Sequence, residues 1–340
     1  MPPSPEIPSS RVLRVASRAW VLVALLLLVS CGGRDDSSPG DFRVALLLTG
    51  PISDDGWNAS AVDGLLLLEK ELGARVSTVE SLDKSRFEEN LREFAAQGYD
   101  LIFGHAYEFQ DAVLRVASDF PETVFIVIAG NRHAANVGAV HFQLEEATYV
   151  LGALAARLSE RPVAGMIGGE EIPSLKPGFD GFENGARSVN PDIQVVRKYV
   201  GNWHDVALAR EHAEALIEQG AQFLFQNADK AGLGVFQAAS AHEGVWAFGS
   251  NRDQNRVVPG AVLASAVLDV PAAYLSIGKA VRSGEYTPEA AKVGVAEGVV
   301  SVFVSPDAAA SLGPEVAAFL AYLEQRIAAG EIDVLASPLN

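Results

Sequence analysis

The sequence is poor in residues that cross-link chains or hold metals. Its 340 residues include one cysteine, Cys31, and six histidines. A single cysteine allows no disulfide framework. No histidine falls in an H-E-x-x-H motif, and no second cysteine is present to join one as a ligand. We therefore expect neither a metal nor another cofactor.

Motifs of common hydrolases and nucleotide enzymes are also missing. The chain has no G-x-S-x-G, Gly232-x-Gly234 lacks a third glycine, and residues 165–169 carry no G-K-[ST]. A serine nucleophile elbow and a phosphate-binding loop are thereby excluded. The sequence predicts a protein that is not an enzyme.

Basic charge is scarce as well. Lys and Arg number 26 against 43 Asp and Glu, which gives a formal net charge of −17. An acidic surface repels nucleic acid and anionic lipid, so neither is expected as a partner of the main body.

One apolar run stands out, at residues 20–29, after the basic residues Arg11, Arg14 and Arg18. About 20 residues are needed to span a bilayer, so this run is typical of a signal peptide, here residues 1–30. It ends in Leu-Val-Ser-Cys31, which resembles the lipobox of bacterial lipoproteins. We expect acylated Cys31 as the first mature residue and residues 31–40 as a flexible tether. The alternative is an ordinary signal peptide with an incidental cysteine. With the lipobox, the protein is predicted on the extracytoplasmic face of a bacterial membrane.

From residue 41 onward, short apolar strands alternate with amphipathic helices. This alternation predicts α/β architecture with parallel sheets and right-handed crossovers. The pattern restarts near residue 145, so we expect two doubly wound lobes joined by a hinge. The first lobe is predicted at residues 41–142 with about 245–268. The second is predicted at residues 143–244 with about 269–340.

The stretch at residues 50–60 reads G-P-I-S-D-D-G-W-N-A-S and joins the first strand to a helix predicted at residues 59–72. Ligands of open parallel sheets bind at such strand ends. Trp57 is a large aromatic in a polar setting, and Asn58 can donate and accept hydrogen bonds. The sequence therefore predicts half of a ligand clamp here.

Polar and aromatic residues follow the other strands too. Each alone is as well explained by turn chemistry or helix capping, as for Asp54 or Asp205. Trp57 and Trp203, however, follow equivalent strands of the two lobes, and closure would place a flat ligand between them. The alternative is that both anchor the core. The candidate ligand-binding residues are Asp54, Trp57, Asn58, His105, Tyr107, Phe179, Trp203, Asn227 and Asp253.

Several ordered motifs resemble the basic membrane protein family of substrate-binding lipoproteins of ABC importers. Residues 50–57 resemble the G-P-x-G-D-x-G-W turn of one branch, and residues 185–191, 201–205 and 249–253 resemble later motifs. The likeness runs from about Phe42 to about Ser283. It implies a type I periplasmic-binding-protein fold, a purine nucleobase or nucleoside as ligand, and an ABC permease as partner.

In nucleoside binders of that family an aromatic–Asn pair touches the ligand, a second-lobe aromatic stacks on it, and an Asp holds the ribose. These roles match Trp57-Asn58, Trp203 and Asp253. Three charged contacts of the family are replaced by Leu48, by Ala129 and within residues 264–268. The resemblance thus predicts a flat heteroaromatic ligand, with a free base at least as well supported as a nucleoside. A sensor module of the same fold and a lipid-anchored nucleoside-acting enzyme remain as alternatives.

Overall fold

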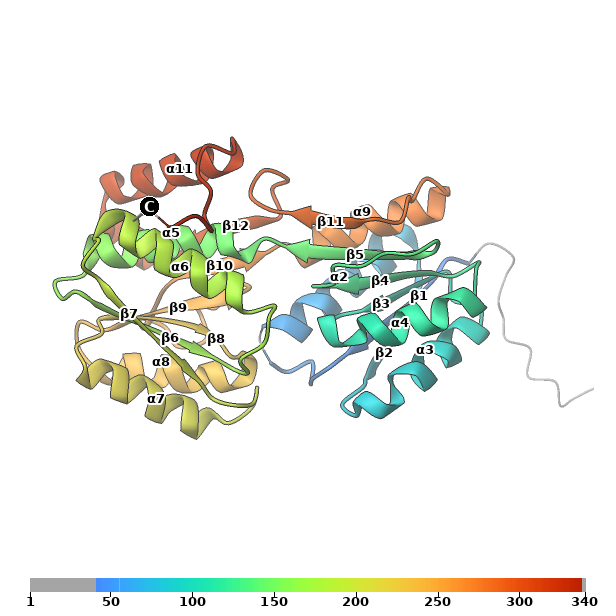
Figure 1. Cartoon of the computed structure of the whole chain (residues 1–340), viewed down its shortest axis with the longest axis horizontal. Helices are drawn as coiled ribbons and strands as arrows, with labels where there is room; N and C mark the ends of the chain where they lie inside the picture. The colour runs from blue at the N-terminus through green and yellow to red at the C-terminus, as the bar shows by residue number, and fades with distance from the viewer. Residues whose placement is uncertain (1–40, 55, 338–340) are drawn as a thin grey trace, which may run out of the picture. The chain divides into compact units, whose positions relative to one another are not determined.

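The computed structural model describes residues 41–54 and 56–337. The predicted signal peptide at residues 1–30, Cys31 and the tether at residues 31–40 lie outside the described residues. From Phe42 onward the chain forms one compact unit. It contains two six-stranded sheets, each covered by helices (Figure 1).

The first sheet has the strand order β11-β5-β4-β3-β1-β2, and all its strands are parallel. Apolar residues bury both faces of its central strands, as expected where helices cover a parallel sheet on both sides. On β1, Val44 and Leu46 face one core and Ala45 and Leu47 face the other. The strands are β1 (Arg43–Leu48), β2 (Arg75–Glu80), β3 (Leu101–Gly104), β4 (Val124–Ile128), β5 (Val137–Phe142) and β11 (Ala290–Val293).

Four helices enclose this first sheet. Residues of α2 and α9 share a core with Val44 and Leu46, whereas residues of α3 and α4 share the opposite core with Ala45 and Leu47. The sequence placed the start of the first helix at residue 59, but α2 begins at Trp57. The helices are α2 (Trp57–Leu72), α3 (Phe87–Ala96), α4 (Gln110–Val116) and α9 (Val270–Ser283).

The second sheet has the order β12-β10-β9-β8-β6-β7, in which only β12 runs antiparallel. Its strands are β6 (Val163–Gly168), β7 (Gln194–Tyr199), β8 (Phe223–Asn227), β9 (Trp246–Asn251), β10 (Val262–Leu268) and β12 (Val300–Val304). Its helices are α5 (Leu144–Leu158), α6 (Lys176–Val189), α7 (Val206–Glu218), α8 (Gly232–Ala241), α10 (Pro306–Leu312) and α11 (Pro314–Ala328). None of the described helices is long and apolar enough to cross a bilayer.

The predicted division of the later chain between the lobes is wrong in part. Residues 245–268 were expected in the first lobe, but β9 and β10 belong to the second sheet. Residues 269–340 were expected in the second lobe; α9 and β11 belong to the first (orange in Figure 1), whereas β12 and the helices after it belong to the second, as expected. The physical reason is helix packing, because a Cβ on Gly278 of α9 would lie 2.4 Å from Leu68 Cδ2 of α2. Such close approach fixes α9 against the first lobe.

Three segments of chain cross between the lobes, and hydrogen bonds tie them together. The Gln143 N–H donates to the Val293 carbonyl at 2.8 Å, and the Asp269 N–H donates to the Val299 carbonyl at 2.8 Å. The Val295 N–H donates to Glu146 Oε2 at 2.7 Å. The crossings therefore form one connected hinge.

Candidate ligand-binding site

A cleft of about 520 Å³ lies where the strands of both sheets end, within the range typical of small-molecule sites. Six of the nine predicted residues line it. Four come from the first lobe and two from the second: Asp54, Trp57, Asn58, Tyr107, Trp203 and Asn227.

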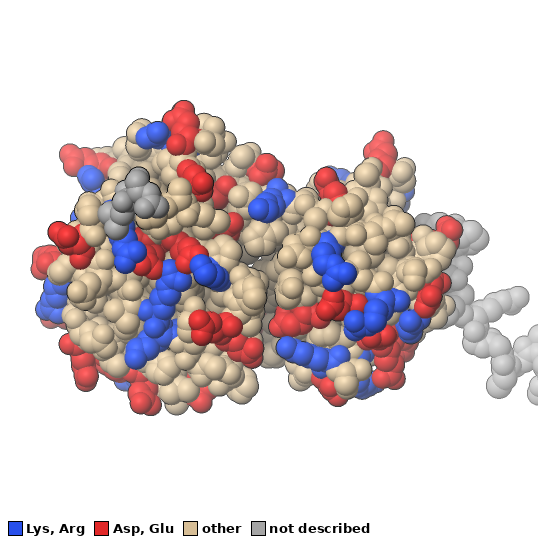
Figure 2. All heavy atoms as spheres, viewed as in Figure 1, with Lys and Arg blue, Asp and Glu red and all other residues tan. Residues whose placement is uncertain are grey.

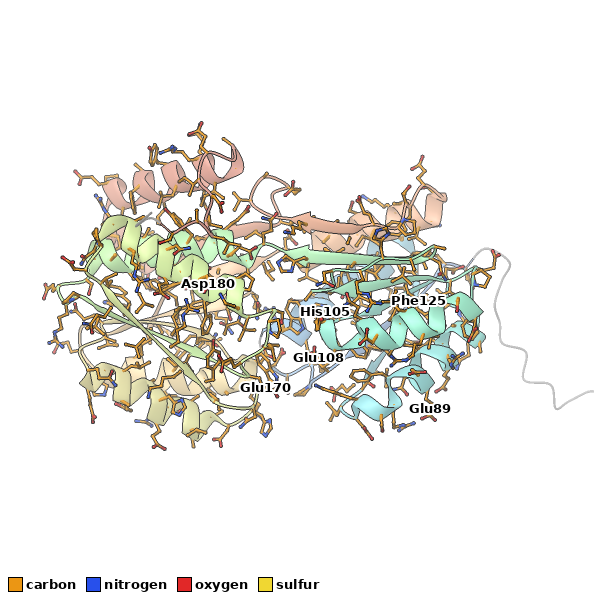
Figure 3. All side chains as sticks on the ribbon, viewed as in Figure 1. Glu89, His105, Glu108, Phe125, Glu170 and Asp180 are labelled. Atoms are coloured by element: carbon orange, nitrogen blue, oxygen red, sulfur yellow. The ribbon has the colours of Figure 1, made fainter. Side chains whose placement is uncertain are left out.

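The cleft carries more acidic than basic side chains. Glu108 and Glu170 lie on opposite lobes beside it (Figure 3), and acidic side chains appear on both sides of the groove in Figure 2. Lys84 Nζ lies 3.9 Å from Glu108 Oε1, which offsets part of that charge. The charged lining residues are Asp54, Lys84, Glu108, Glu170, Asp229 and Lys230. Negative potential of this kind favours ligands rich in hydrogen-bond donors.

Asp54 organises the turn that the sequence singled out. Its Oδ1 accepts hydrogen bonds from the N–H groups of Gly56 at 3.0 Å and Ala59 at 3.0 Å. Its Oδ2 accepts from the Asn58 N–H at 2.7 Å and from Asn58 Nδ2 at 2.8 Å. A carboxylate at the first turn also stabilises the helix dipole. Asp54 lines the cleft, yet its own turn uses its acceptor capacity.

The contact with Asp54 determines how the Asn58 side chain is oriented. A carboxylate only accepts, so the atom bonded to Asp54 must be the amide nitrogen, and this fixes the orientation of the side chain. The Asn58 side chain is buried, and its Oδ1 has no hydrogen-bond partner among the described residues. A buried acceptor without a partner costs free energy.

Trp57 is held beside a fully buried histidine. Trp57 Nε1–H donates to the His105 carbonyl at 3.0 Å, and the two rings lie 4.1 Å apart at 31°. His105 Nε2 contacts the Trp57 carbonyl at 3.0 Å, and Nδ1 contacts the Tyr274 hydroxyl at 2.8 Å. Burial lowers the pKa of His105 to about 3, so its ring is neutral at physiological pH. His105 was predicted to contact ligand, but it supports Trp57 from beneath and does not line the cleft.

Trp203 reaches the same cleft from the second lobe. It lies against the backbone of Gly169, where an added Cβ would be 2.2 Å from Trp203 Cε3. The next turn is fixed by Asp205, which caps α7 through a 3.0 Å bond from the Leu208 N–H, as predicted. The two tryptophans come from different lobes to one cavity, but the strands that they follow are not equivalent as predicted, because Trp57 follows β1, next to the edge of its sheet, and Trp203 follows the edge strand β7.

Strained backbone gathers at the cleft. Ala129, Asp229 and Asn251 have φ values of 60°, 48° and 68°, and they are the non-glycine residues with positive φ in the described chain. All three line the cleft. Such conformations cost free energy and concentrate at functional sites. Asn251 also donates to Asn227 Oδ1 at 3.4 Å.

Asp229 is the site residue that the sequence prediction missed. It opens a short 3₁₀ turn, Asp229–Ala231, immediately after β8. Burial raises the pKa of Asp229 to about 8, and the charges of Asp54 and Glu108 across the cleft raise it further. Its carboxyl group is therefore largely protonated at neutral pH and can donate a hydrogen bond. Its position after a strand end was the signal by which the sequence could have identified it.

Phe179 and Asp253, also predicted to bind ligand, do not line the cleft. Phe179 faces inward from α6, is fully buried, and stacks on Tyr199 with centroids 5.6 Å apart. Asp253 is exposed and its Oδ1 accepts from the Asn255 N–H at 3.0 Å, a local turn contact. Its neighbour Arg252 instead pairs with Asp63 of α2 at 3.0 Å, which joins the two lobes.

The three departures noted in the sequence occupy different places. Leu48 is fully buried in the core, whereas Ala129 and Leu268 line the cleft. At two positions where the family carries charged contacts, the cleft wall of this chain is therefore apolar. Among the described residues, no group of three or more His, Cys, Asp or Glu is placed to hold a metal ion.

Comparison with known proteins shows which family this chain resembles. A family model described as ABC transporter substrate-binding protein PnrA-like matches residues 42–327. A purine-binding protein of Brucella abortus is 30% identical over 88% of this chain and 84% of that protein. The transcriptional activator protein med of Bacillus subtilis is 28% identical over 79% of this chain and 84% of that protein. An ABC transporter nucleoside-binding protein of Lactococcus lactis is 28% identical over 71% of this chain and 74% of that protein.

Solved structures show the same architecture. A solute-binding protein of an ABC transporter system from Aeropyrum pernix matches with a TM-score of 0.78 at 21% identity, over 88% of this chain and 94% of that chain. Another from Conexibacter woesei matches with a TM-score of 0.72 at 26% identity, over 86% of this chain and 98% of that chain.

Proposed function

Because the chain belongs to the PnrA-like family of ABC transporter substrate-binding proteins and has the predicted type I periplasmic-binding fold, we propose that it binds a purine nucleobase or nucleoside. The ligand would then pass to the permease of an ABC importer. The observation that carries the ligand class is the pair of tryptophans, Trp57 and Trp203, which line one cleft from two lobes. Each aromatic face stacked on a base contributes about 1–3 kcal/mol.

The polar groups beside the tryptophans support a nitrogen heterocycle. Asn58 Oδ1 is a buried acceptor in need of a donor, and Asp229 supplies a carboxyl proton from the other lobe. A purine edge carries both donors and acceptors and can meet both groups. The relatives named above as binding purine and nucleoside support the same class.

The free base is favoured over the nucleoside. The sugar-holding role was assigned to Asp253, which is exposed and does not line the cleft. Titrating the protein with adenine, adenosine and guanosine, and following tryptophan fluorescence, tests the proposal. We expect a saturable response to at least one purine and the tightest binding for adenine. Absence of a response to every purine would overturn the ligand class.

We further propose that the protein is a lipoprotein anchored through Cys31 outside the cytoplasm. The motif before Cys31 supports this, as does the family, whose members serve ABC importers. Expression in bacteria of the wild-type chain and Cys31→Ala, followed by membrane fractionation and mass spectrometry, tests it. The wild type should carry acyl chains at Cys31 and the variant should not sediment with membranes.

Two other functions are separable by experiment. A sensor role is kept because the B. subtilis relative is named a transcriptional activator; deletion of the gene should then alter transcription and leave purine uptake intact. An enzyme acting on nucleosides would need a poised carboxylate. Asp54 already accepts four hydrogen bonds, which leaves Glu108 and Glu170 as the candidates at the cleft. Incubation with inosine tests them, and we expect no release of free base.

A further inference from the structure

Three segments distant in sequence meet under the cleft. Tyr274 comes from α9, His105 follows β3, and Trp57 is the first residue of α2. Tyr274 and His105 are fully buried, whereas Trp57 is partly exposed at the cleft wall. Hydrogen bonds connect the three in series, with 2.8 Å between the Tyr274 hydroxyl and His105 Nδ1 and 3.0 Å between His105 Nε2 and the Trp57 carbonyl. We call this series the Tyr274–His105–Trp57 brace.

The partners determine which imidazole nitrogen carries the proton. The Trp57 carbonyl can only accept, so His105 Nε2 must be the protonated nitrogen. Nδ1 of the neutral ring is then an acceptor, and the Tyr274 O–H donates to it. This is the one arrangement in which both ring nitrogens and the tyrosine hydroxyl are satisfied.

Tyr274 is itself fixed in position. Its ring stacks on Phe103 of β3, with centroids 3.9 Å apart at 7°. On the α2 side, a Cβ added to Gly64 would lie 2.9 Å from Tyr274 Cδ2, so helix and ring are in close contact. The hydroxyl is therefore presented to His105 from a rigid platform.

The brace controls Trp57 at two points. His105 holds the Trp57 carbonyl through its ring, and the His105 carbonyl accepts from Trp57 Nε1–H at 3.0 Å. We propose that Tyr274 is a positioning residue that sets the orientation of the Trp57 ring in the cleft by fixing the tautomer and tilt of His105. The effect on ligand affinity rests on the proposed function, whereas the effect on Trp57 does not.

The binding test compares two substitutions that each delete one tyrosine hydroxyl. Tyr274→Phe keeps the stack on Phe103 and removes only the hydroxyl. Tyr99→Phe is the matched control, since Tyr99 is also buried in the first lobe and its hydroxyl lies 2.6 Å from Ser77 Oγ, away from the brace. In calorimetric titrations of the full chain with adenine and adenosine, we expect Tyr274→Phe to weaken binding about tenfold, because it leaves His105 Nδ1 unsatisfied. Tyr99→Phe should leave affinity unchanged. Equal affinity in all three proteins, or equal weakening in both variants, would overturn the proposal.

A second measurement needs no ligand. Nitrogen-15 NMR of the wild-type imidazoles should show His105 as the Nε2–H tautomer from pH 5 to 8. The Trp57 indole N–H resonance should shift and exchange faster in Tyr274→Phe but not in Tyr99→Phe. A wild-type His105 protonated on Nδ1, or an unchanged Trp57 indole resonance in Tyr274→Phe, would refute the brace. If the wild type binds neither purine, the proposed function fails and these spectra alone decide the role of Tyr274.

Discussion

The rings of the two cleft tryptophans are positioned by different kinds of contact. Trp57 is positioned by polar contacts, namely the carboxylate of Asp54 in its turn and the buried His105 beside its ring. The ring of Trp203 is positioned by packing on the backbone of Gly169, where no side chain intervenes, and its carbonyl accepts from the Ala231 N–H at 3.1 Å. Hydrogen bonds are directional and fix the angle at which a ring is held, whereas packing on a flat surface allows the ring to slide along it. The first lobe therefore presents the more rigid of the two rings to a ligand.

The largest effect is expected from removing the polar contacts that hold the turn of Trp57. Asp54→Ala leaves four N–H donors without their acceptor and should lower the free energy of unfolding by about 3 kcal/mol. The equivalent residue beside Trp203 is Asp205, which caps α7 through the Leu208 N–H, so Asp205→Ala should cost about 1 kcal/mol. Urea denaturation of both variants measures the difference. Equal losses would show that the two turns are built alike.

The next effect is expected from disturbing the packing contact of Trp203. In Gly169→Ala the new methyl group overlaps Trp203, so the ring must move and adenine binding should weaken about tenfold. Gly178→Ala is the control in the same lobe, since the nearest atom to its added Cβ is 3.8 Å away. Titration calorimetry of both variants provides the measurement. Unchanged affinity in Gly169→Ala would mean that Trp203 does not depend on that contact.

Substituting the tryptophans themselves tests the contrast between the two rings directly. Trp57→Phe removes the Nε1–H bond to the His105 carbonyl as well as contact area, and we expect about tenfold weaker adenine binding. Trp203→Phe keeps a flat ring, and we expect about threefold weaker binding. Trp246→Phe is the control, because Trp246 opens β9 and does not line the cleft. The reverse order of the first two would contradict the assignment of Trp57 as the rigid ring.

The last effect concerns the proton that the folded protein holds on Asp229. Burial raises the pKa of Asp229 from 3.8 to about 8, so the folded protein retains a proton that the unfolded chain releases above pH 4. The stability that this proton supplies is present at acidic pH and is lost as the pH rises towards 8. Linkage with these two pKa values gives a fall in the free energy of unfolding of about 2 kcal/mol between pH 6 and 8, and because Asp229 is only partly buried we expect solvent screening to reduce it to about 1 kcal/mol. Asp229→Asn should flatten that slope in urea denaturation, and an unchanged slope would assign it to other groups.

Much of the fold was predictable because its determinants are local. Alternating strands and helices, strand-end turns and the cap at Asp205 depend on residues within a few positions of one another. The assignment of 245–268 failed because it depends on which strands β9 and β10 pair with, and that of α9 and β11 failed because it depends on how α9 packs against α2. The contact of Gly278 with Leu68 joins segments far apart in sequence, and periodicity carries no information about it.

The candidate site shows the same division. Trp57, Asn58 and Trp203 line the cleft, and their positions after strands follow from the alternation. Phe179 is buried instead, because its direction depends on which face of α6 meets the sheet. His105 is also buried, and its hydrogen-bond partner Tyr274 lies 169 residues away. Such pairings are fixed by three-dimensional packing and have no sequence signature.

The interleaved chain also has a consequence for biosynthesis. The first sheet begins at β1 but receives its edge strand β11 and its covering helix α9 only after most of the second sheet has been made. Neither lobe is a contiguous segment that a ribosome or secretion pore can release as a finished module. Closing such long sequence separations slows folding. Until α9 is made, α2 alone of these two helices covers its face of the first sheet, and a truncation before α9 would leave His105 without Tyr274.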